Sequence, residues 1–154
     1  MGSHLTPAEL GALLTRWRPT GCEVVVGPHR MLPDGYEGVA IEVGKHRARI
    51  HLADAPEKSS YHLFVYFHEV AHVRLGHVAF RRVMPEAVIR EYEAERFAEW
   101  VFRIEGLHLP RHVLEVARRR LCEQIMEAKS LDPSYQPPGR IARWARYKGD
   151  TDER

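Results

Sequence analysis

Hydrophobic residues recur at intervals of three and four along much of the chain, and in one stretch they alternate with polar residues. The first spacing is typical of an amphipathic α-helix and the second of a β-strand with one buried face. The spacing predicts helices over residues 7–17, 61–76, 85–105 and 110–129, and a short basic helix over 140–148. Runs of β-branched residues and the alternation predict strands over residues 22–26, 38–43 and 45–52.

Residues that begin and end helices support these boundaries. Thr6 offers a hydroxyl N-cap just before a proline, which suits the first helical position. Gly76 and Gly106 are suited to the C-terminal ends of the second and third long helices. Breaks at proline and glycine predict a loop over residues 27–38.

The strand over residues 45–52 shows the alternation most clearly. We expect one of its faces to be buried and the other to lie in water. The predicted buried face holds Ala48, Ile50 and Leu52, and the predicted wet face holds Arg47, Arg49 and His51. Because this strand comes shortly before the helix at 61–76, we expect it to be an edge where an extended peptide can pair with the backbone.

The order of the elements predicts the α+β class: a helix, a small sheet and then further helices. A chain of 154 residues is long enough for one domain with its own hydrophobic core, which we place at residues 5–148. Residues 1–4 (MGSH) look like an expression scar, and residues 149–154 are expected to form a disordered tail.

Composition narrows the class further. Hydrophobic residues make up 44% and charged residues 29% of the chain, which is typical of a globular protein, and the net charge of +2 indicates no strongly charged partner. No apolar run reaches the about 20 residues that cross a membrane, and no signal peptide opens the chain. Cys22 and Cys122 form no CxxC pair, so we expect reduced thiols and a cytoplasmic location.

The segment HEVAH, at residues 68–72, lies in the predicted helix at 61–76. Four residues advance a helix by about 6 Å and slightly more than one turn, so His68 and His72 project from one face. Two neutral imidazoles can then bind one zinc ion, and Glu69 beside them can act as a general base toward water. Such a pattern also arises by chance in a histidine-rich chain, but the apolar periodicity around it favours a buried helix and a metal site.

A catalytic zinc ion usually has three protein ligands, so a third is needed further along the chain. Glu91, Glu93 and Glu95 lie together in the predicted helix at 85–105. At about 100° per residue, Glu91 and Glu95 share a face with small and apolar residues, whereas Glu93 faces the opposite side. Buried carboxylates are costly without a cation, so we predict Glu91 as the ligand and Glu95 as an outer hydrogen-bond acceptor for a ligand histidine. Taken alone, these residues would also fit a solvated helix.

HEVAH together with a downstream E-x-E-A-x-x-F-A motif resembles the ImmA/IrrE family of zinc metallopeptidases. The motif consists of Glu91, Glu93, Ala94, Phe97 and Ala98. The resemblance covers about residues 39–101 and implies a compact zincin-like domain of the gluzincin type. It also implies zinc as the cofactor and a protein or peptide as the substrate, since some family members cleave transcriptional repressors.

Within this resemblance, the family's E-x-x-x-D/N pattern supplies the metal ligand, which corresponds to Glu91. The chain departs from the pattern at Glu95, where Asp or Asn is common, and this adds a methylene to the outer contact. The peptidase reading further requires a donor for the oxyanion of the transition state. Five candidates remain open: Tyr61, His62, His108, His112 and Tyr135.

Two other functions compete with a peptidase. The first is a non-enzymatic protein-interaction module that holds zinc in the same site. The second is a DNA-associated regulator that uses the basic C-terminal third, in which Trp144 and Tyr147 lie among arginines. The arginines are Arg118, Arg119, Arg120, Arg140, Arg143 and Arg146. His77 lies off the ligand face of the helix, which favours a role in local packing or solvation.

Overall fold

The computed structural model describes residues 5–27, 32, 37–79 and 82–148. Our expectations for residues 1–4 and 149–154 fall outside the described residues. The same holds for most of the loop predicted over residues 27–38, of which only positions at its two ends and residue 32 are described.

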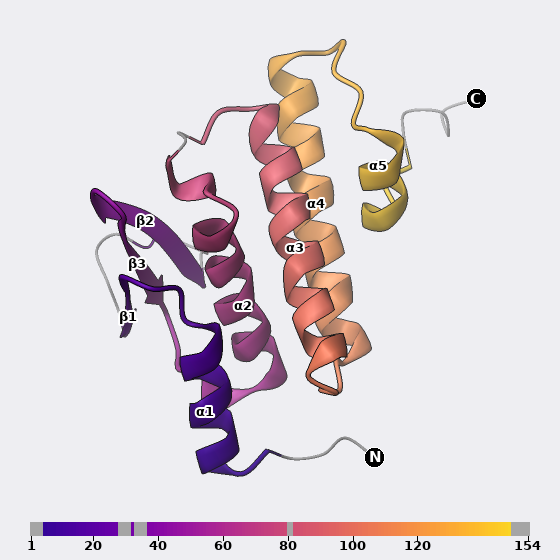
Figure 1. Ribbon diagram of the computed structural model, residues 1–154. Helices are drawn as coiled ribbons and strands as arrows, with labels where there is room; N and C mark the ends of the chain where they lie inside the picture. The colour runs from indigo at the N-terminus through magenta and orange to yellow at the C-terminus, as the bar shows by residue number, and fades with distance from the viewer. Residues whose placement is uncertain (1–4, 28–31, 33–36, 80–81, 149–154) are drawn as a thin grey trace.

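Within the described residues the fold is α+β, as predicted, with five α-helices and a three-stranded sheet (Figure 1). The helices are α1 (Pro7–Trp17), α2 (Ser60–Arg74), α3 (Glu86–Ile104), α4 (Arg111–Leu131) and α5 (Gly139–Ala145). The strands are β1 (Cys22–Val26), β2 (Gly38–Gly44) and β3 (Arg47–Leu52), and two 3-10 turns are η1 (Pro56–Lys58) and η2 (His77–Ala79).

The helix boundaries follow the local signals in the sequence. Thr6 caps α1 in a reciprocal capping box with Glu9, and Ser59 caps α2 by accepting from the backbone N–H of His62. Gly76 has φ +75° just after α2, a left-handed conformation that glycine adopts readily. The last helix is shorter than predicted, because the chain leaves it at Arg146 in a left-handed conformation.

The strand order is β1-β3-β2, with β1 parallel and β2 antiparallel to β3. Our expectation that the strand over residues 45–52 offers a free edge is therefore wrong. The backbone of β3 is paired on both sides, because β3 lies between β1 and β2 in the sheet. Among the described strands, β2 is the edge strand next to α2.

The prediction that the second face of β3 lies in water is also wrong at one residue, His51. Ala48, Ile50 and Leu52 are buried as expected, but His51 on the other face is only 2% exposed. Val25 of β1 and Val39 of β2 are the register neighbours of His51. A central strand is shielded by a neighbour on each side, so alternation in its own sequence does not show how wet its outer face is.

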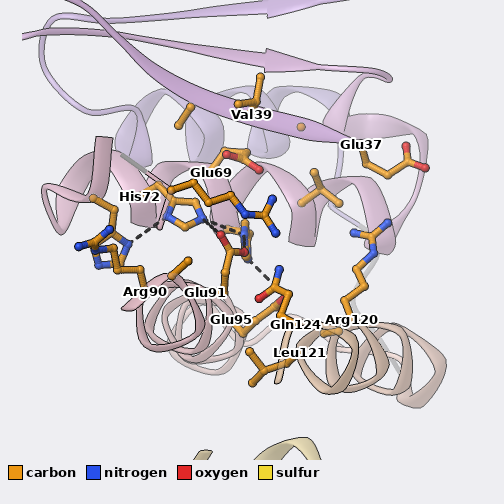
Figure 2. A pocket seen from close by; sticks show the side chains of 18 of the residues that line it. Glu37, Val39, Glu69, His72, Arg90, Glu91, Glu95, Arg120, Leu121 and Gln124 are labelled. Carbon is orange, nitrogen blue, oxygen red and sulfur yellow. Dashed lines mark hydrogen bonds and ion pairs between the residues drawn. The ribbon is translucent and has the colours of Figure 1, made fainter. Parts of the chain in front are cut away.

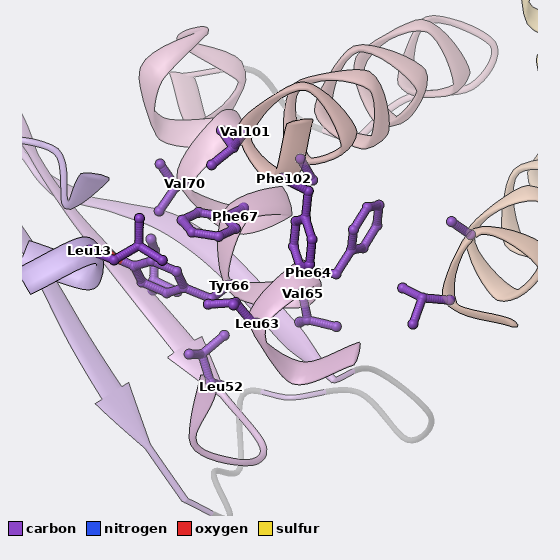
Figure 3. Packing of buried hydrophobic residues seen from close by; sticks show 14 of the residues in the cluster. Leu13, Leu52, Leu63, Phe64, Val65, Tyr66, Phe67, Val70, Val101 and Phe102 are labelled. Carbon is purple, nitrogen blue, oxygen red and sulfur yellow. The ribbon is translucent and has the colours of Figure 1, made fainter. Parts of the chain in front are cut away.

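Helix α2 lies between the sheet and the α3–α4 pair, and α5 packs on the far side of α4 (Figure 1). Because α2 is covered on two sides, most of its residues from Leu63 to Ala71 are buried. Its aromatic residues form the main core, in which Phe67 contacts Phe102 of α3 and Trp17 of α1 edge to face (Figure 3).

A second buried cluster joins α3, α4 and α5. Its fully buried members include Val88, Leu121, Ile125 and Ile141. This cluster holds α4 against α3, so that α4 can form a wall opposite the sheet. None of the helices in the described part of the chain is long and apolar enough to cross a membrane.

Candidate metal centre

Two helices bring the three predicted ligands together (Figure 2). His68 and His72 project from one face of α2, and their Nε2 atoms are 3.0 Å apart. Glu91 of α3 lies across from both, with Oε2 at 3.3 Å from Nε2 of His68 and Oε1 at 3.5 Å from Nε2 of His72. The three groups thus converge on one point between the helices.

Small residues on α3 allow this convergence. Ala94 and Ala98 are fully buried on the face that meets α2, and Glu95 on the same face is 6% exposed. Residues with small side chains let two helix axes approach closely. Glu91 lies about one turn of α3 before Ala94 and about two turns before Ala98. Because these alanines let the two helices approach, the carboxylate of Glu91 can reach the imidazoles.

The distances suit a tetrahedral metal ion. Ligand atoms ~2.0–2.2 Å from a tetrahedral zinc ion are separated from one another by about 3.3–3.5 Å. The observed separations of 3.0, 3.3 and 3.5 Å between the two Nε2 atoms and the Glu91 oxygens lie near that range. Two imidazoles and a carboxylate are also a donor set that zinc uses in catalytic sites. The residues present fit zinc, and zinc binding itself remains a prediction.

Each histidine has a partner for its outer nitrogen. Nδ1 of His68 lies 3.5 Å from Oε1 of Glu95, the residue that we predicted as its outer acceptor, although the contact is long for a hydrogen bond. Nδ1 of His72 lies 3.0 Å from Nδ1 of His77. If both Nε2 atoms bound an ion at the shared point, the hydrogen of each neutral ring would be on Nδ1, which could then donate outward.

The contact of His77 is one that our sequence reasoning missed. With Nδ1 accepting from His72, the Nε2–H of His77 can donate to Oε2 of Glu93 at 3.0 Å. His77 lies beyond the end of α2, where Gly76 and the η2 turn fold the chain back beside the helix. Helical periodicity does not extend past a helix end, so the glycine was the only local signal that His77 could return. Glu93 is not among the candidate ligands, and its carboxylate ends the series of contacts that runs from His72 through His77.

Glu69 faces the same cleft without joining the three ligands (Figure 2). Its side chain is buried, and the start of β2 presses against it. A Cβ at Gly38 would lie 2.9 Å from Cγ and 3.1 Å from Oε1 of Glu69. Burial raises the pKa of the Glu69 carboxyl, and the imidazoles of His68 and His72 oppose that rise. Such a group is suited to receiving and returning a proton.

The electrostatics of the centre show strong pairing between the two imidazoles and the carboxylates beside them. Burial acts to lower the pKa of His68, but the carboxylates of Glu95 and Glu91 outweigh it and raise that pKa well above its usual value. Burial acts to raise the pKa of Glu91, but hydrogen bonds from His68 and His72 outweigh it and hold that pKa well below its usual value. These opposed shifts show that the carboxylates of the centre favour a positive charge beside them.

The centre lies in a cleft of about 600 Å³. Residues 38–42 of β2 form one wall, α4 forms the other, and α2 and α3 form the floor. Sequence reasoning grouped Arg120 with the basic C-terminal third, yet Arg120 and Gln124 line the cleft (Figure 2). Only the packing of α4 against α3 turns this face inward.

Of the five candidate oxyanion donors, the structure places only Tyr61 in the lining of this cleft. His108 and His112 are exposed near the start of α4, and Tyr135 packs with the second buried cluster. His62 lies with Glu37 and Asp54 in a separate group whose potential ligand atoms are within 4.8 Å of one another.

The arginines of the C-terminal third are engaged in several different contacts. Glu115 binds both Arg118 and Arg146, and Arg118 also lies over the Trp144 ring. The guanidinium of Arg140 lies 5.9 Å from the centre of the Tyr92 ring. These contacts spread the positive charge over different neighbours.

Comparisons with protein-family models, with curated proteins and with solved structures found no match. Functional arguments for this chain therefore rest on its own residues and geometry.

Proposed function

We propose that the protein is a zinc-dependent metallopeptidase with a zincin-like fold of the gluzincin type, similar to the ImmA/IrrE family. The observation that supports this most directly is the convergence of His68, His72 and Glu91 in a cleft that also holds the buried, non-ligand Glu69. A site that only stabilises the fold would have no use for a carboxylate beside its ligands. The substrate class is a protein or peptide, such as a transcriptional regulator.

In this proposal His68, His72 and Glu91 hold the ion. Glu95 and His77 keep the two imidazoles in the tautomer in which Nε2 is unprotonated. Zinc bound there would polarise the scissile carbonyl and lower the pKa of water. Glu69 takes the proton of the attacking water on a carboxylate oxygen and returns it to the leaving amine. Its raised pKa favours both transfers, because a very weak base would not take up the proton.

The edge of β2 is the place where the backbone of a substrate would bind. β2 lines the cleft beside Glu69, and among the described strands it has a neighbour on one side only. An extended peptide can pair with such an edge as an additional strand, which carries the backbone past the metal ligands. β2 thus replaces β3 in the role that we first expected for the strand over residues 45–52.

The experiment that tests the proposal compares Glu69→Gln with Glu57→Gln, the same change at an exposed carboxylate on η1. We expect both variants to bind zinc as tightly as the parent protein, measured by metal analysis after gel filtration. Zinc-dependent hydrolysis of a peptide library should be lost in Glu69→Gln and unchanged in Glu57→Gln. Unchanged hydrolysis in Glu69→Gln would contradict the assigned base.

The non-enzymatic alternative predicts a different result from the same experiment. A zinc site used only for stability or partner binding would hold the ion in all three proteins, and chelation would lower the unfolding temperature. None of the three would then hydrolyse the library with or without zinc. That outcome would replace the peptidase with an interaction module.

A further inference from the structure

We infer that Tyr61 and Arg120 form a subsite for a substrate carboxylate, at the end of the cleft beyond the metal ligands. This inference rests on the proposed peptidase function and specifies its substrate class. It assigns a role to an arginine on α4 that sequence reasoning had grouped with the basic C-terminal third.

Three consecutive arginines on α4 point in three directions. Arg118 is paired with Glu115 and lies over Trp144, and Arg119 is exposed to solvent. Arg120 instead reaches into the cleft from the α4 wall (Figure 2). The fold therefore selects one of three identical side chains for the cleft.

Arg120 is held by an aromatic ring and not by an acid. Its guanidinium lies 5.6 Å from the centre of the Tyr61 ring. Within the described part of the chain, no carboxylate lies within ion-pair distance of Arg120, whereas Glu115 is shared by three other arginines. Glu37 is on the same side of the cleft, but its carboxylate is grouped with Asp54 and His62. A partly buried guanidinium without an acidic partner is well suited to bind a carboxylate through two parallel hydrogen bonds.

Tyr61 provides a second donor at the same place. Burial raises the pKa of its hydroxyl, so the group stays protonated at neutral pH and can donate a hydrogen bond. Both side chains are half-buried and line the cleft. A ligand carboxylate there would accept from a cation and a neutral hydroxyl together.

The position of Tyr61 sets the distance from the scissile bond. Tyr61 precedes His68 by two turns of α2, which is about 10 Å along the helix axis. An extended peptide rises about 3.3 Å per residue, so the carboxylate lies roughly three residues from the bond that is cut. Val65 of α2 and Val113 and Ala117 of α4 line the cleft in this part of the molecule, which favours apolar substrate side chains in between.

The test uses zinc-loaded Glu69→Gln protein to capture peptides without cutting them. The probe is a synthetic peptide library with two arms: free C-terminal acids with neutral side chains, and C-terminal amides with Asp or Glu at varied positions. We expect peptides of one arm to be enriched. Enrichment of the first arm would identify a C-terminal carboxylate as the ligand, and enrichment of the second arm a side-chain carboxylate. Adding Arg120→Gln should weaken their binding by about 10- to 100-fold, as expected for loss of a charge-assisted hydrogen bond.

Controls separate the subsite from general effects of charge and folding. Arg119→Gln removes the same charge at the exposed neighbouring position and should leave the enrichment unchanged. Arg120→Glu should shift the preference toward Lys and Arg. Circular dichroism and thermal unfolding check that each variant is folded, and Arg120→Lys provides a variant that keeps the charge in case Arg120→Gln does not fold.

The outcomes distinguish this inference from the proposed function. No enrichment for carboxylates, or equal loss in Arg119→Gln and Arg120→Gln, would overturn the subsite. Hydrolysis by the parent protein without preference for an acid near the third residue would also overturn it, with the peptidase intact. Carboxylate-dependent capture without any hydrolysis by the parent protein would keep the subsite and remove the peptidase.

Discussion

Two groups of similar residues in this protein could each supply ligands to a metal ion, and the surroundings of the two groups differ. His68, His72 and Glu91 are partly buried on two packed helices, and Glu37, Asp54 and His62 stand nearer the surface beside η1. In both groups the potential ligand atoms lie within 4.8 Å of one another. The residue types and the distances between potential ligand atoms therefore do not distinguish the two groups.

The partners of each group do separate them. In the second group Nζ of Lys58 lies 2.8 Å from Asp54, so a cation is already present, and the Asp54 side chain is 41% exposed. Nδ1 of His62 is occupied by the hydroxyl of Ser59 at 2.7 Å. The first group has no lysine or arginine ion pair at its carboxylates among the described contacts. The first group therefore suits a metal ion better, because its carboxylate has no lysine or arginine partner and its side chains are held on two packed helices.

The largest effect is expected from removing one ligand in each group. His68→Ala should abolish tight zinc binding, with a loss greater than the about 10- to 100-fold that removal of an outer partner costs. His62→Ala should leave the bound zinc unchanged. Metal analysis and competition with a fluorescent chelator measure both. Zinc retained by His68→Ala, or lost by His62→Ala, would reverse our assignment of the two groups.

The next effect concerns Gly38, which follows Glu37 of one group and touches Glu69 beside the other. In Gly38→Ala the new Cβ would meet Glu69 at 2.9 Å and Val65 at 3.0 Å, so the carboxylate must shift. A displacement of about 1 Å at a catalytic group can reduce the rate by about 100-fold. We expect a loss of kcat on that scale with zinc affinity unchanged, measured by steady-state hydrolysis and chelator competition.

The matched control for Gly38→Ala is Gly11→Ala on α1, where a Cβ meets nothing within 4 Å. This control should keep full activity, and alanine has the better helix propensity. Full activity in Gly38→Ala as well would show that Glu69 has room to move, and that its position beside β2 is not critical.

A moderate effect is expected from the outer partners of the two groups. His77→Ala removes the acceptor for Nδ1 of His72 and should weaken zinc binding by about 10- to 100-fold. Ser59→Ala removes the partner of His62 and should leave zinc affinity unchanged, although loss of the α2 N-cap should cost about 1 kcal/mol of stability. Zinc titration and urea unfolding measure these effects. Equal zinc affinity in both variants would remove the positioning role of His77.

The smallest effect is expected from Lys58→Ala. The ion pair with Asp54 is exposed on both sides, so its loss should change the free energy of unfolding by less than about 1 kcal/mol. We expect no additional zinc ion to bind, because Asp54 remains exposed. The group of Glu37, Asp54 and His62 also lies outside the contact between α2 and α3. An additional zinc ion bound by this variant, found by metal analysis, would show that the lysine alone had separated the two groups.

Local patterns in the sequence were sufficient to predict a good part of this structure. Periodicity placed His68 and His72 on one face of α2 and put Glu91 and Glu95 on the opposite side of α3 from Glu93. Capping residues and glycines placed the helix ends within a few residues. These features depend on contacts within about one turn of the chain, so they can be read from neighbouring residues.

Other features were decided only when distant segments met. The strand order buried His51 and moved the free edge from β3 to β2. The turn after Gly76 brought His77 back to His72, and the contact of α4 with α3 turned Arg120 into the cleft. A residue pattern specifies which side chains share a face, but burial of hydrophobic surface between elements determines what each face meets. For this protein, the sequence by itself therefore predicted which residues converge at the candidate metal centre, whereas the surroundings of those residues depended on the tertiary structure.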